Sequence, residues 1–172
     1  GEKPKTLPEA IRIFILGVAY GMINGDHLNK KNRSMLIHPS TSRSVHIEWK
    51  GWVEGILNKY SKAYESKALN ILDKSSRIDF SFEEVEKDFL ESYAEIIKTE
   101  KNFPKYDNFF IKNIHKALQE VSNNVMLFNG DDGPIPFIDW ESGNVYGRIL
   151  VGGIGLERGY TINGLTVSYV VR

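Results

Sequence analysis

Residues 150–172 read LVGGIGLERGYTINGLTVSYVVR, and this C-terminal stretch decides how the chain is interpreted. Together with Ile149 before it, the stretch begins as a run of large or β-branched apolar residues, which is typical of a buried strand. A glycine-dense turn between two buried strands is where an α/β protein brings its backbone close to a ligand. The rest of the chain is therefore expected to support this turn. The turn holds Gly152, Gly153, Gly155 and Gly159, and the second strand holds Leu165, Val167, Tyr169, Val170 and Val171.

Length and composition limit the class of protein. The chain has 172 residues, enough for one domain with a real core. Its formal net charge is zero, so any contact with nucleic acid requires a local patch of charge. The lack of cysteine excludes disulfides, thiolate-bound zinc and thiol catalysis, and it fits a reducing compartment.

No membrane or export segment is visible in the sequence. The most apolar run, residues 11–23, contains Arg12 and is shorter than the roughly 20 apolar residues that span a bilayer. Residues 1–7 are polar and lack the basic-then-apolar order of a signal peptide. We therefore predict a soluble, cytoplasmic protein that makes no contact with membranes.

The pattern of apolar residues predicts an α/β fold. Short apolar strands separated by helices indicate a parallel sheet of about four strands flanked by helices. Residues 61–122 are charged and helical, carry no chemical signature, and are expected to form a helical insertion within a single domain. A capping box is expected at Ser81. The expected strands cover residues 34–37, 125–128, 149–151 and 166–171, and the expected helices cover residues 6–24, 42–60, 81–101 and 107–121.

A hydroxyl-rich turn joins the first expected strand to the second expected helix. The strand ends at His38, and Ser40, Thr41 and Ser42 follow. Such a turn directs free N–H groups and hydroxyls outward, which is a geometry that binds phosphate. The same residue types are ordinary helix caps, so both interpretations stay open.

The glycine turn matches neither of two common phosphate-binding loops. Gly153-Ile154-Gly155 fits the start of a G-x-G-x-x-G fingerprint, but Arg158 occupies the position of the third glycine. Turn and strand, not a helix, are predicted after it, so a dinucleotide-binding fold is rejected. A GxxxxGK[ST] loop is absent from the sequence. Arg158 is placed to reach an anionic ligand, or to form a salt bridge with Glu157 or Asp139.

The sequence predicts no metal site. Glu48-Trp49-Lys50 and Glu65-Ser66-Lys67 resemble half of a metal-dependent nuclease site, but both lie in expected helices, where Glu and Lys are typical of a solvated face. Asp131-Asp132 can bind a cation, yet an Asp-Asp-Gly-Pro sequence is more typical of a turn. The four histidines show no metal-ligand spacing.

The C-terminal stretch also contains a longer pattern, Gly-Gly-x-x-Leu-x-Arg-Gly-x-Thr-x-x-Gly-Leu-x-x-Ser-Tyr followed by an Arg. This pattern resembles the signature of the Z1 domain family. Residues 34–40, SMLIHPS, are similar to another stretch of that family, and residues 6–23 resemble its leading helix, whereas residues 60–122 match only in general character. Glu157 stands where the family usually has Ser. The matching positions are Gly152, Gly153, Leu156, Arg158, Gly159, Thr161, Gly164, Leu165, Ser168, Tyr169 and Arg172.

The resemblance implies a motor function. The family is found in endonucleases assigned to bacterial and phage restriction-type systems, and it resembles the second RecA-like lobe of superfamily 2 helicases. In that comparison residues 34–41 take the place of helicase motif IV, and residues 152–161 that of motif V, which contacts the nucleic-acid backbone. Arg158 is then the candidate catalytic residue. The candidate nucleotide- or DNA-binding residues are Ser40, Thr41, Gly152, Gly153, Gly159 and Thr161.

The resemblance also implies partners. A full-length protein would use ATP and Mg²⁺, bound mainly by a first motor lobe that this chain lacks, and it would act on DNA as an ATP-dependent hydrolase. Gly1 resembles a cloning remnant and the chain stops at Arg172 inside an apparent strand, so residues 1–172 are expected to be a truncated domain that is inactive alone. The competing hypothesis is a non-catalytic nucleic-acid or protein-interaction module of RecA-like shape, which the neutral charge favours. A nuclease site within this chain is a third option, which the rejected Glu-x-Lys pairs oppose.

Overall fold

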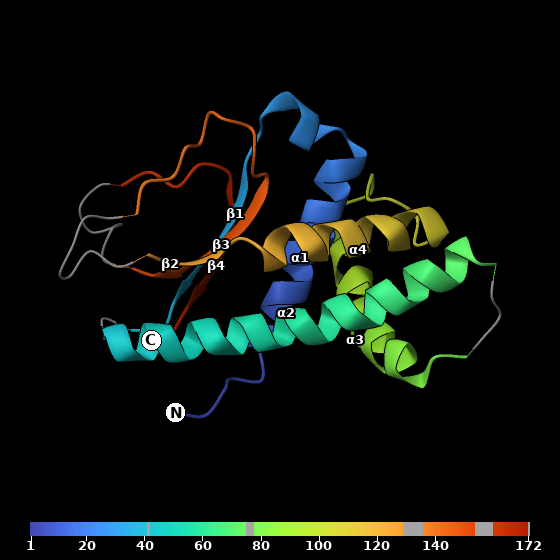
Figure 1. The fold of residues 1–172 in the computed structure, drawn as a ribbon, viewed down its shortest axis with the longest axis horizontal. Helices are drawn as coiled ribbons and strands as arrows, with labels where there is room; N and C mark the ends of the chain where they lie inside the picture. Colours follow the sequence, from blue (N-terminus) through green and yellow to red (C-terminus); the bar gives the residue numbers. More distant parts are fainter. Residues whose placement is uncertain (41, 75–77, 129–135, 154–159, 172) are drawn as a thin grey trace.

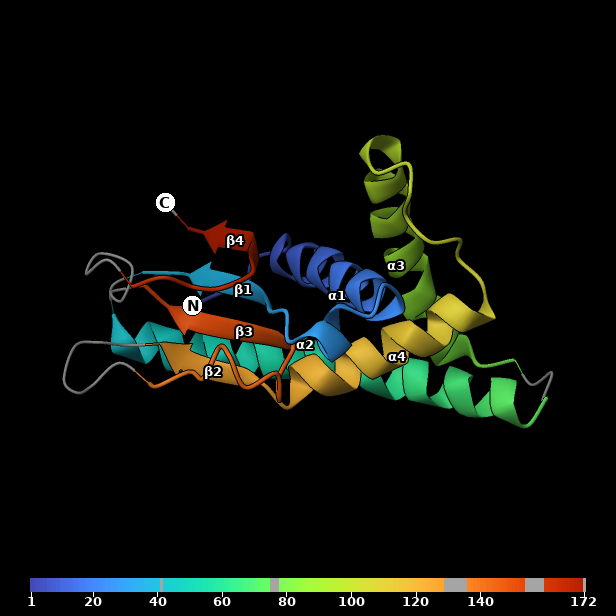
Figure 2. The same ribbon diagram turned by 90° about the horizontal axis from the view of Figure 1, so that it is seen from above.

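In a computed structural model, which describes residues 1–40, 42–74, 78–128, 136–153 and 160–171, four α-helices and one short 3-10 helix accompany a four-stranded sheet. All strands are parallel, in the order β2-β3-β1-β4 (Figure 2). The predicted α/β class is confirmed, and the arrangement is consistent with a RecA-like fold. The helices are α1 (Leu7–Ile23), η1 (Asp26–Asn29), α2 (Arg43–Leu72), α3 (Phe80–Thr99) and α4 (Asn108–Ser122), and the strands are β1 (Arg33–His38), β2 (Val125–Phe128), β3 (Gly147–Gly152) and β4 (Leu165–Val170).

Helices cover one face of the sheet. Alternate side chains of β1 and β3, among them Ile37 and Val151, enter one buried core together with residues of α1, α2, α3 and α4. The helices α1, α2 and α4 pack against the strands, and α3 packs mainly on α1 and α2 (Figure 1). Residues 61–122 contribute Tyr64, Phe89 and Phe110 to this same core. Their description as an insertion stays a prediction.

Irregular segments cover the described part of the other face. Leu36, Leu150 and Phe128 are buried on this face against Ile138 and Ile162. This cover is needed because a central parallel strand carries apolar side chains on both faces.

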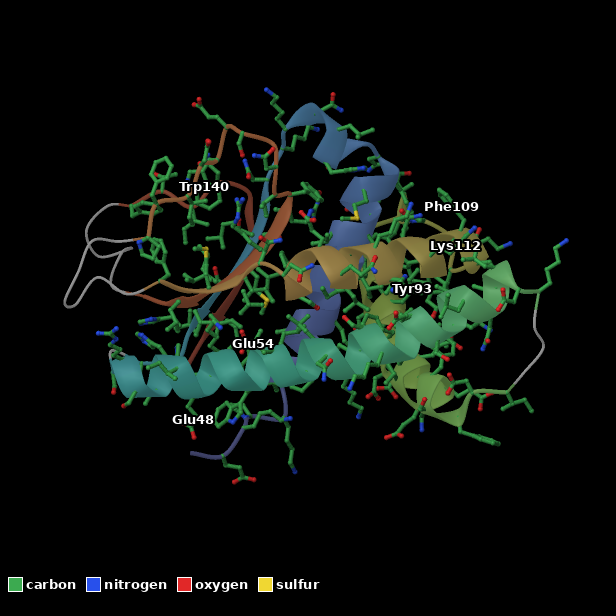
Figure 3. All side chains as sticks on the ribbon, viewed as in Figure 1. Glu48, Glu54, Tyr93, Phe109, Lys112 and Trp140 are labelled. Carbon is green, nitrogen blue, oxygen red and sulfur yellow. The ribbon has the colours of Figure 1, made fainter. Side chains whose placement is uncertain are left out.

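Two aromatic residues complete this cover. Tyr160 packs on Phe128, with ring centroids 4.9 Å apart. Trp140, which lies in the loop region beside the strands (Figure 3), donates from Nε1 to the hydroxyl of Tyr160 at 3.3 Å. Residues 136–146 and 160–162 therefore cover the face that the described helices leave open.

The strand β4 differs from its prediction. The sequence predicts buried strands on both sides of the glycine turn, and β3 is buried along its whole length. In contrast, β4 is the edge strand beside β1, and Leu165 and Val170 are exposed. Only Val167 and Tyr169 are partly buried against the helical core. The apolar composition of β4 alone could not show that it lies at an edge.

Two helix boundaries also differ from prediction. The helix α2 continues past its predicted end near Tyr60 to Leu72, because Ala63, Tyr64 and Ala68 extend its buried face. The N-cap of α3 is Asp79 rather than Ser81. Its Oδ1 accepts hydrogen bonds from the backbone N–H groups of Ser81 and Phe82, both at 3.1 Å. Hydrogen bonds from the side chains of Ser66 and Ser81 lower the pKa of Asp79 to about 2.

Thr6 stands at the N-cap position of α1 but does not cap the helix with its side chain. Its side chain makes no capping hydrogen bond. Its hydroxyl instead pairs with the hydroxyl of Tyr169 at 2.7 Å. The start of α1 is thereby tied to the edge strand β4.

Candidate functional site

The candidate site lies where the strands end. The strands β1 and β3 are parallel neighbours, with Ile37 opposite Val151, so they end at the same edge of the sheet, at His38 and Gly152. In open α/β sheets, ligands bind outside the carboxyl ends of the strands. The turns that follow His38 and Gly152 hold most of the candidate residues.

His38 joins these two turns. Its Nδ1 donates a hydrogen bond to the carbonyl oxygen of Gly152 at 2.8 Å, and because a carbonyl can only accept, the proton is on Nδ1. A Cβ added to Gly153 would lie 1.7 Å from the same nitrogen. The backbone of Gly152 and Gly153 therefore packs directly against the imidazole, and a side chain at position 153 would clash with it.

Ser40 has a structural role in the turn after β1. Its hydroxyl accepts a hydrogen bond from the N–H of Ser42 at 3.0 Å. Its carbonyl accepts one from Nε2 of His46 at 2.6 Å, and His46 is fully buried in α2. The N-cap residue of α2, Ser42, and His46 in its first turn thus fix the backbone that leaves β1.

The capping interpretation of this turn does not hold for Ser42. Ser42 stands at the N-cap position of α2, yet its side chain makes no capping hydrogen bond. Its hydroxyl instead pairs with the hydroxyl of Ser44 at 2.9 Å. Phosphate binding by this turn stays a prediction.

The structure places only some of the candidate residues. Ser40 lies in the turn after β1, Gly152 is the last residue of β3 and Gly153 follows it, and both glycines are buried. Thr161 is exposed, directly before the buried Ile162. The remaining candidates lie outside the described residues: Arg158, Thr41 and Gly159, together with Asp131 and Asp132.

The alternative partner of Arg158 has a local role. Oδ1 of Asp139 accepts hydrogen bonds from the N–H groups of Glu141 and Ser142, both at 3.1 Å. Asp139 therefore stabilises its own turn.

The Glu-x-Lys pairs lie on a helix, as predicted. Both are in α2, where Glu48 (Figure 3) accepts from the chain N-terminus at 2.7 Å and Lys50 forms an ion pair with Glu54. The ammonium of Lys67 lies 5.4 Å from the ring centroid of Phe82. No group of three or more His, Asp or Glu side chains within the described residues is arranged to hold a metal ion.

The residue that sequence reasoning missed is His38. The sequence shows it only as the end of a strand and as one of four histidines without metal-ligand spacing. A histidine that ends one strand, next to a strand that ends in Gly152-Gly153, is the signal that could have revealed the contact.

Comparison with known proteins places the chain in a family. The family model described as Z1 domain matches residues 6–172. The chain belongs to the Z1 domain family. The match extends over the leading helix, the SMLIH strand and the glycine turn, so the resemblance read from the sequence is confirmed at the level of the family. No curated protein and no solved structure matches this Z1 domain. In the described part of the Z1 domain, every helix is too short or too polar to cross a bilayer.

Proposed function

We propose that this Z1 domain is the second lobe of a DNA-dependent, helicase-like ATPase in an endonuclease of a restriction or phage-defence system. One observation carries the proposal: His38 joins the turn after β1 to the turn after β3. In the resemblance to helicases, these turns take the places of motifs IV and V. This hydrogen bond gives such a lobe a direct contact through which a change in one turn can reach the other.

The residues of this chain supply part of such a site. Arg158 would stabilise the negative charge that develops on a phosphate during hydrolysis. The hydroxyls of Ser40, Thr41 and Thr161, and the backbone N–H groups of the glycine turn, would contact phosphates of the nucleotide or of DNA. The described residues offer hydroxyl groups and a glycine backbone that a ligand can approach closely, but they offer no cluster of carboxylates. We therefore assign Mg²⁺ and most contacts with ATP to another lobe.

The test is substitution of Arg158 in the full-length protein. Arg158→Ala should lower DNA-stimulated ATP hydrolysis by at least about 100-fold, since an arginine that stabilises this charge contributes about 10³–10⁵ in kcat. Lys87→Ala is the matched control, because Lys87 is an exposed cation on α3. An Arg158→Ala protein with unchanged turnover would remove Arg158 from the mechanism.

The neutral charge of the chain favours a second candidate function, a non-catalytic nucleic-acid or protein-interaction module. Under this alternative, the full-length protein hydrolyses no ATP in the presence of DNA. Arg158→Ala then changes only the affinity for the partner. ATP hydrolysis that depends on both DNA and Arg158 supports the motor lobe.

A further inference from the structure

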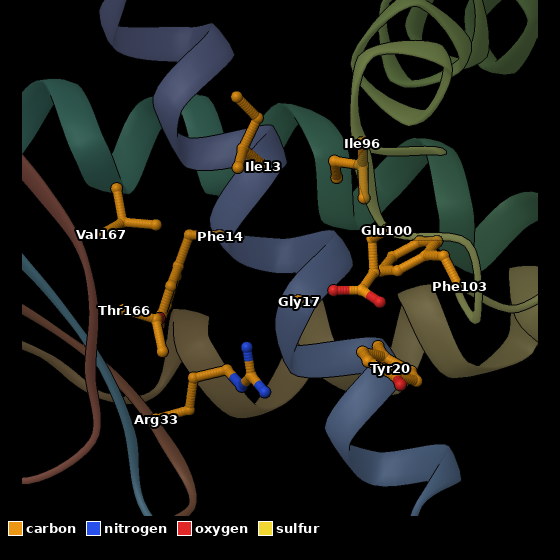
Figure 4. A pocket seen from close by; sticks show the side chains of 10 residues that line it. All are labelled: Ile13, Phe14, Gly17, Tyr20, Arg33, Ile96, Glu100, Phe103, Thr166 and Val167. Atoms are coloured by element: carbon orange, nitrogen blue, oxygen red, sulfur yellow. The ribbon is translucent and has the colours of Figure 1, made fainter. Parts of the chain in front are cut away.

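A cavity lies on the helical side of the molecule. It is open to solvent, has a volume of about 300 Å³, and is lined mainly by α1, the C-terminal end of α3 and the strand β4 (Figure 4). Arg33, at the start of β1, lines it, whereas the candidate site lies at the other end of that strand. Most of its wall is apolar: Ile13, Phe14, Ile96, Phe103 and Val167.

Arg33 presents a positive charge to this cavity. Its Nε donates to the hydroxyl of Tyr146 at 3.0 Å, and its two terminal nitrogens extend toward Gly17 and the cavity in Figure 4. A Cβ at Gly17 would lie 3.0 Å from Nη1, so this glycine makes room for the guanidinium. Burial raises the pKa of Tyr146, which keeps the phenol neutral at pH 7. Within the described residues, Arg33 therefore has no anionic partner.

Glu100 presents a negative charge from the other side. It is the C-cap residue of α3, and its carboxylate extends into the cavity (Figure 4). Its side chain forms no ion pair among the described residues, with Arg33 or with any lysine. The negative end of the α3 dipole adds to its attraction for a cation. Two opposite charges, neither with an ion-pair partner among the described residues, thus face one small cavity with a mainly apolar wall.

We propose that this cavity binds a free α-amino acid with a large apolar side chain. The ligand carboxylate pairs with the guanidinium of Arg33, whose planar fork suits a carboxylate. The ligand ammonium pairs with Glu100 at the end of α3. The side chain packs between Ile13, Ile96 and Phe103, where its apolar surface leaves water.

The size of the cavity supports this class of ligand. Ligand pockets range from about 300 to 1,000 Å³, and this cavity lies at the lower limit, which suits a ligand of one residue. An apolar acid without an amine would leave Glu100 facing the bound ligand unpaired, and an apolar amine would leave Arg33 unpaired. The zwitterion pairs with both charges, so it is favoured over both.

The first test is calorimetric titration of the chain with L-phenylalanine and with two analogues that each lack one charge. These analogues are 3-phenylpropionate, without the ammonium, and phenethylamine, without the carboxylate. Each should bind at least about tenfold more weakly than L-phenylalanine, because a hydrogen bond to a charged group is worth about tenfold or more in affinity. Equal affinity for all three compounds, or no heat of binding with millimolar L-phenylalanine, would overturn the proposal.

Two variants assign the charges. Arg33→Gln should weaken binding of L-phenylalanine and 3-phenylpropionate but not of phenethylamine. Glu100→Gln should weaken binding of L-phenylalanine and phenethylamine but not of 3-phenylpropionate. Because Glu100 is exposed, its variant tests the site even if Arg33→Gln does not fold.

Glu95→Gln is the matched control. Glu95 is also exposed on α3, but it lies outside the cavity and pairs with Lys98 at 2.5 Å. Its variant should bind all three compounds as the unchanged chain does. Loss of affinity in Glu95→Gln equal to that in Glu100→Gln would also overturn the proposal.

Discussion

The imidazole of His38 occupies the space where a side chain at residue 153 would begin. A Cβ built on Gly153 would lie 1.7 Å from Nδ1 of His38, and the same nitrogen donates to the carbonyl of Gly152 at 2.8 Å. One side chain therefore binds and packs against two consecutive residues of the neighbouring turn. Since β1 and β3 are adjacent parallel strands, this contact holds together the two turns at their carboxyl ends.

Gly153→Ala should destabilise the domain. The added methyl group has no room beside His38, so either the imidazole or the turn must move and the hydrogen bond to Gly152 is lost. Overpacking of this kind costs about 1–3 kcal/mol. Urea denaturation followed by circular dichroism measures the change in the free energy of unfolding.

Gly55→Ala is the control for this substitution. Gly55 lies in α2, and nothing is within 4 Å of a Cβ built there. Alanine should therefore be neutral or stabilise the helix by up to about 1 kcal/mol. If the Gly153→Ala and Gly55→Ala proteins unfold at the same urea concentration, then His38 does not pack closely against Gly153.

His38→Ala and His38→Asn should differ. Alanine leaves the carbonyl of Gly152 without its donor, at a cost of about 1–3 kcal/mol in the free energy of unfolding. The amide of asparagine can donate from nearly the same position as Nδ1, so it should recover part of this loss. Under the proposed function, His38→Ala in the full-length protein should lower kcat for ATP hydrolysis more than it changes KM for ATP, because His38 would act by positioning the two turns.

The protonation of His38 gives an independent readout. A nitrogen-15 spectrum of the histidine side chains should show the proton on Nδ1 at neutral pH. A neutral His38 protonated on Nε2 alone, or an alanine variant as stable and active as the unchanged protein, contradicts the role of this hydrogen bond.

Gly164→Ala should release the edge strand β4. Gly164 has φ +67°, and a Cβ there would lie 1.9 Å from the carbonyl oxygen of Asn32. The carbonyl of Gly164 also accepts from the N–H of Ser34 at 2.7 Å, which starts the pairing of β4 with β1. The left-handed conformation alone costs about 1–2 kcal/mol for a residue with a Cβ, and the clash adds to it. Hydrogen exchange of the backbone N–H of Val171, which donates to the carbonyl oxygen of His38, should become faster.

Gly25→Ala is the control that separates backbone strain from the steric clash expected in Gly164→Ala. Gly25 has φ +76°, but the nearest atom to a Cβ there is 4.0 Å away. In this variant the free energy of unfolding should fall only by the cost of the left-handed conformation. Hydrogen exchange at Val171 should be unchanged. Equal losses of stability in the Gly25 and Gly164 variants would show that Asn32 does not restrict Gly164.

Stability should fall in mild acid because of His115. Burial lowers the pKa of His115 from its usual value of 6.5, against the opposing charge of Glu65. The folded state therefore binds this proton less tightly than the unfolded state. The contribution of His115 to stability is complete above about pH 6.5 and is lost as the pH falls through 6.5 toward the lower pKa of the folded state.

Denaturation at a series of pH values measures this effect. Between pH 7.5 and 5, the free energy of unfolding should decrease less in His115→Gln than in the unchanged chain. Asp79 adds almost nothing in this range, since its contribution is lost only as the pH falls from its usual pKa of 3.8 to its folded pKa of about 2. Identical pH dependence in both proteins would show that His115 is protonated equally in the folded and unfolded states.

Several elements could be predicted because their signals are local. The strand β2 occupies residues 125–128 as expected, since a short apolar run stands between polar segments. The helix α4 begins after Asp107, whose side chain accepts from the N–H of Phe110 at 2.9 Å. The end of α2 was missed because Tyr64 and Ala68 become part of the core only through packing with other helices.

The candidate sites likewise divide into features with a local signal in the sequence and features that depend on tertiary contacts. The sequence by itself determined the α/β class, the parallel strands and membership of the Z1 domain family, since these follow from local patterns of apolar residues and from a long signature. Only the tertiary structure decided that β4 is an exposed edge, that His38 meets Gly152, and that Arg33 and Glu100 face one cavity. The physical reason is distance along the chain. His38 and Gly152 are 114 positions apart, and their contact depends on which strands pair, a choice made by the whole core and by no single segment.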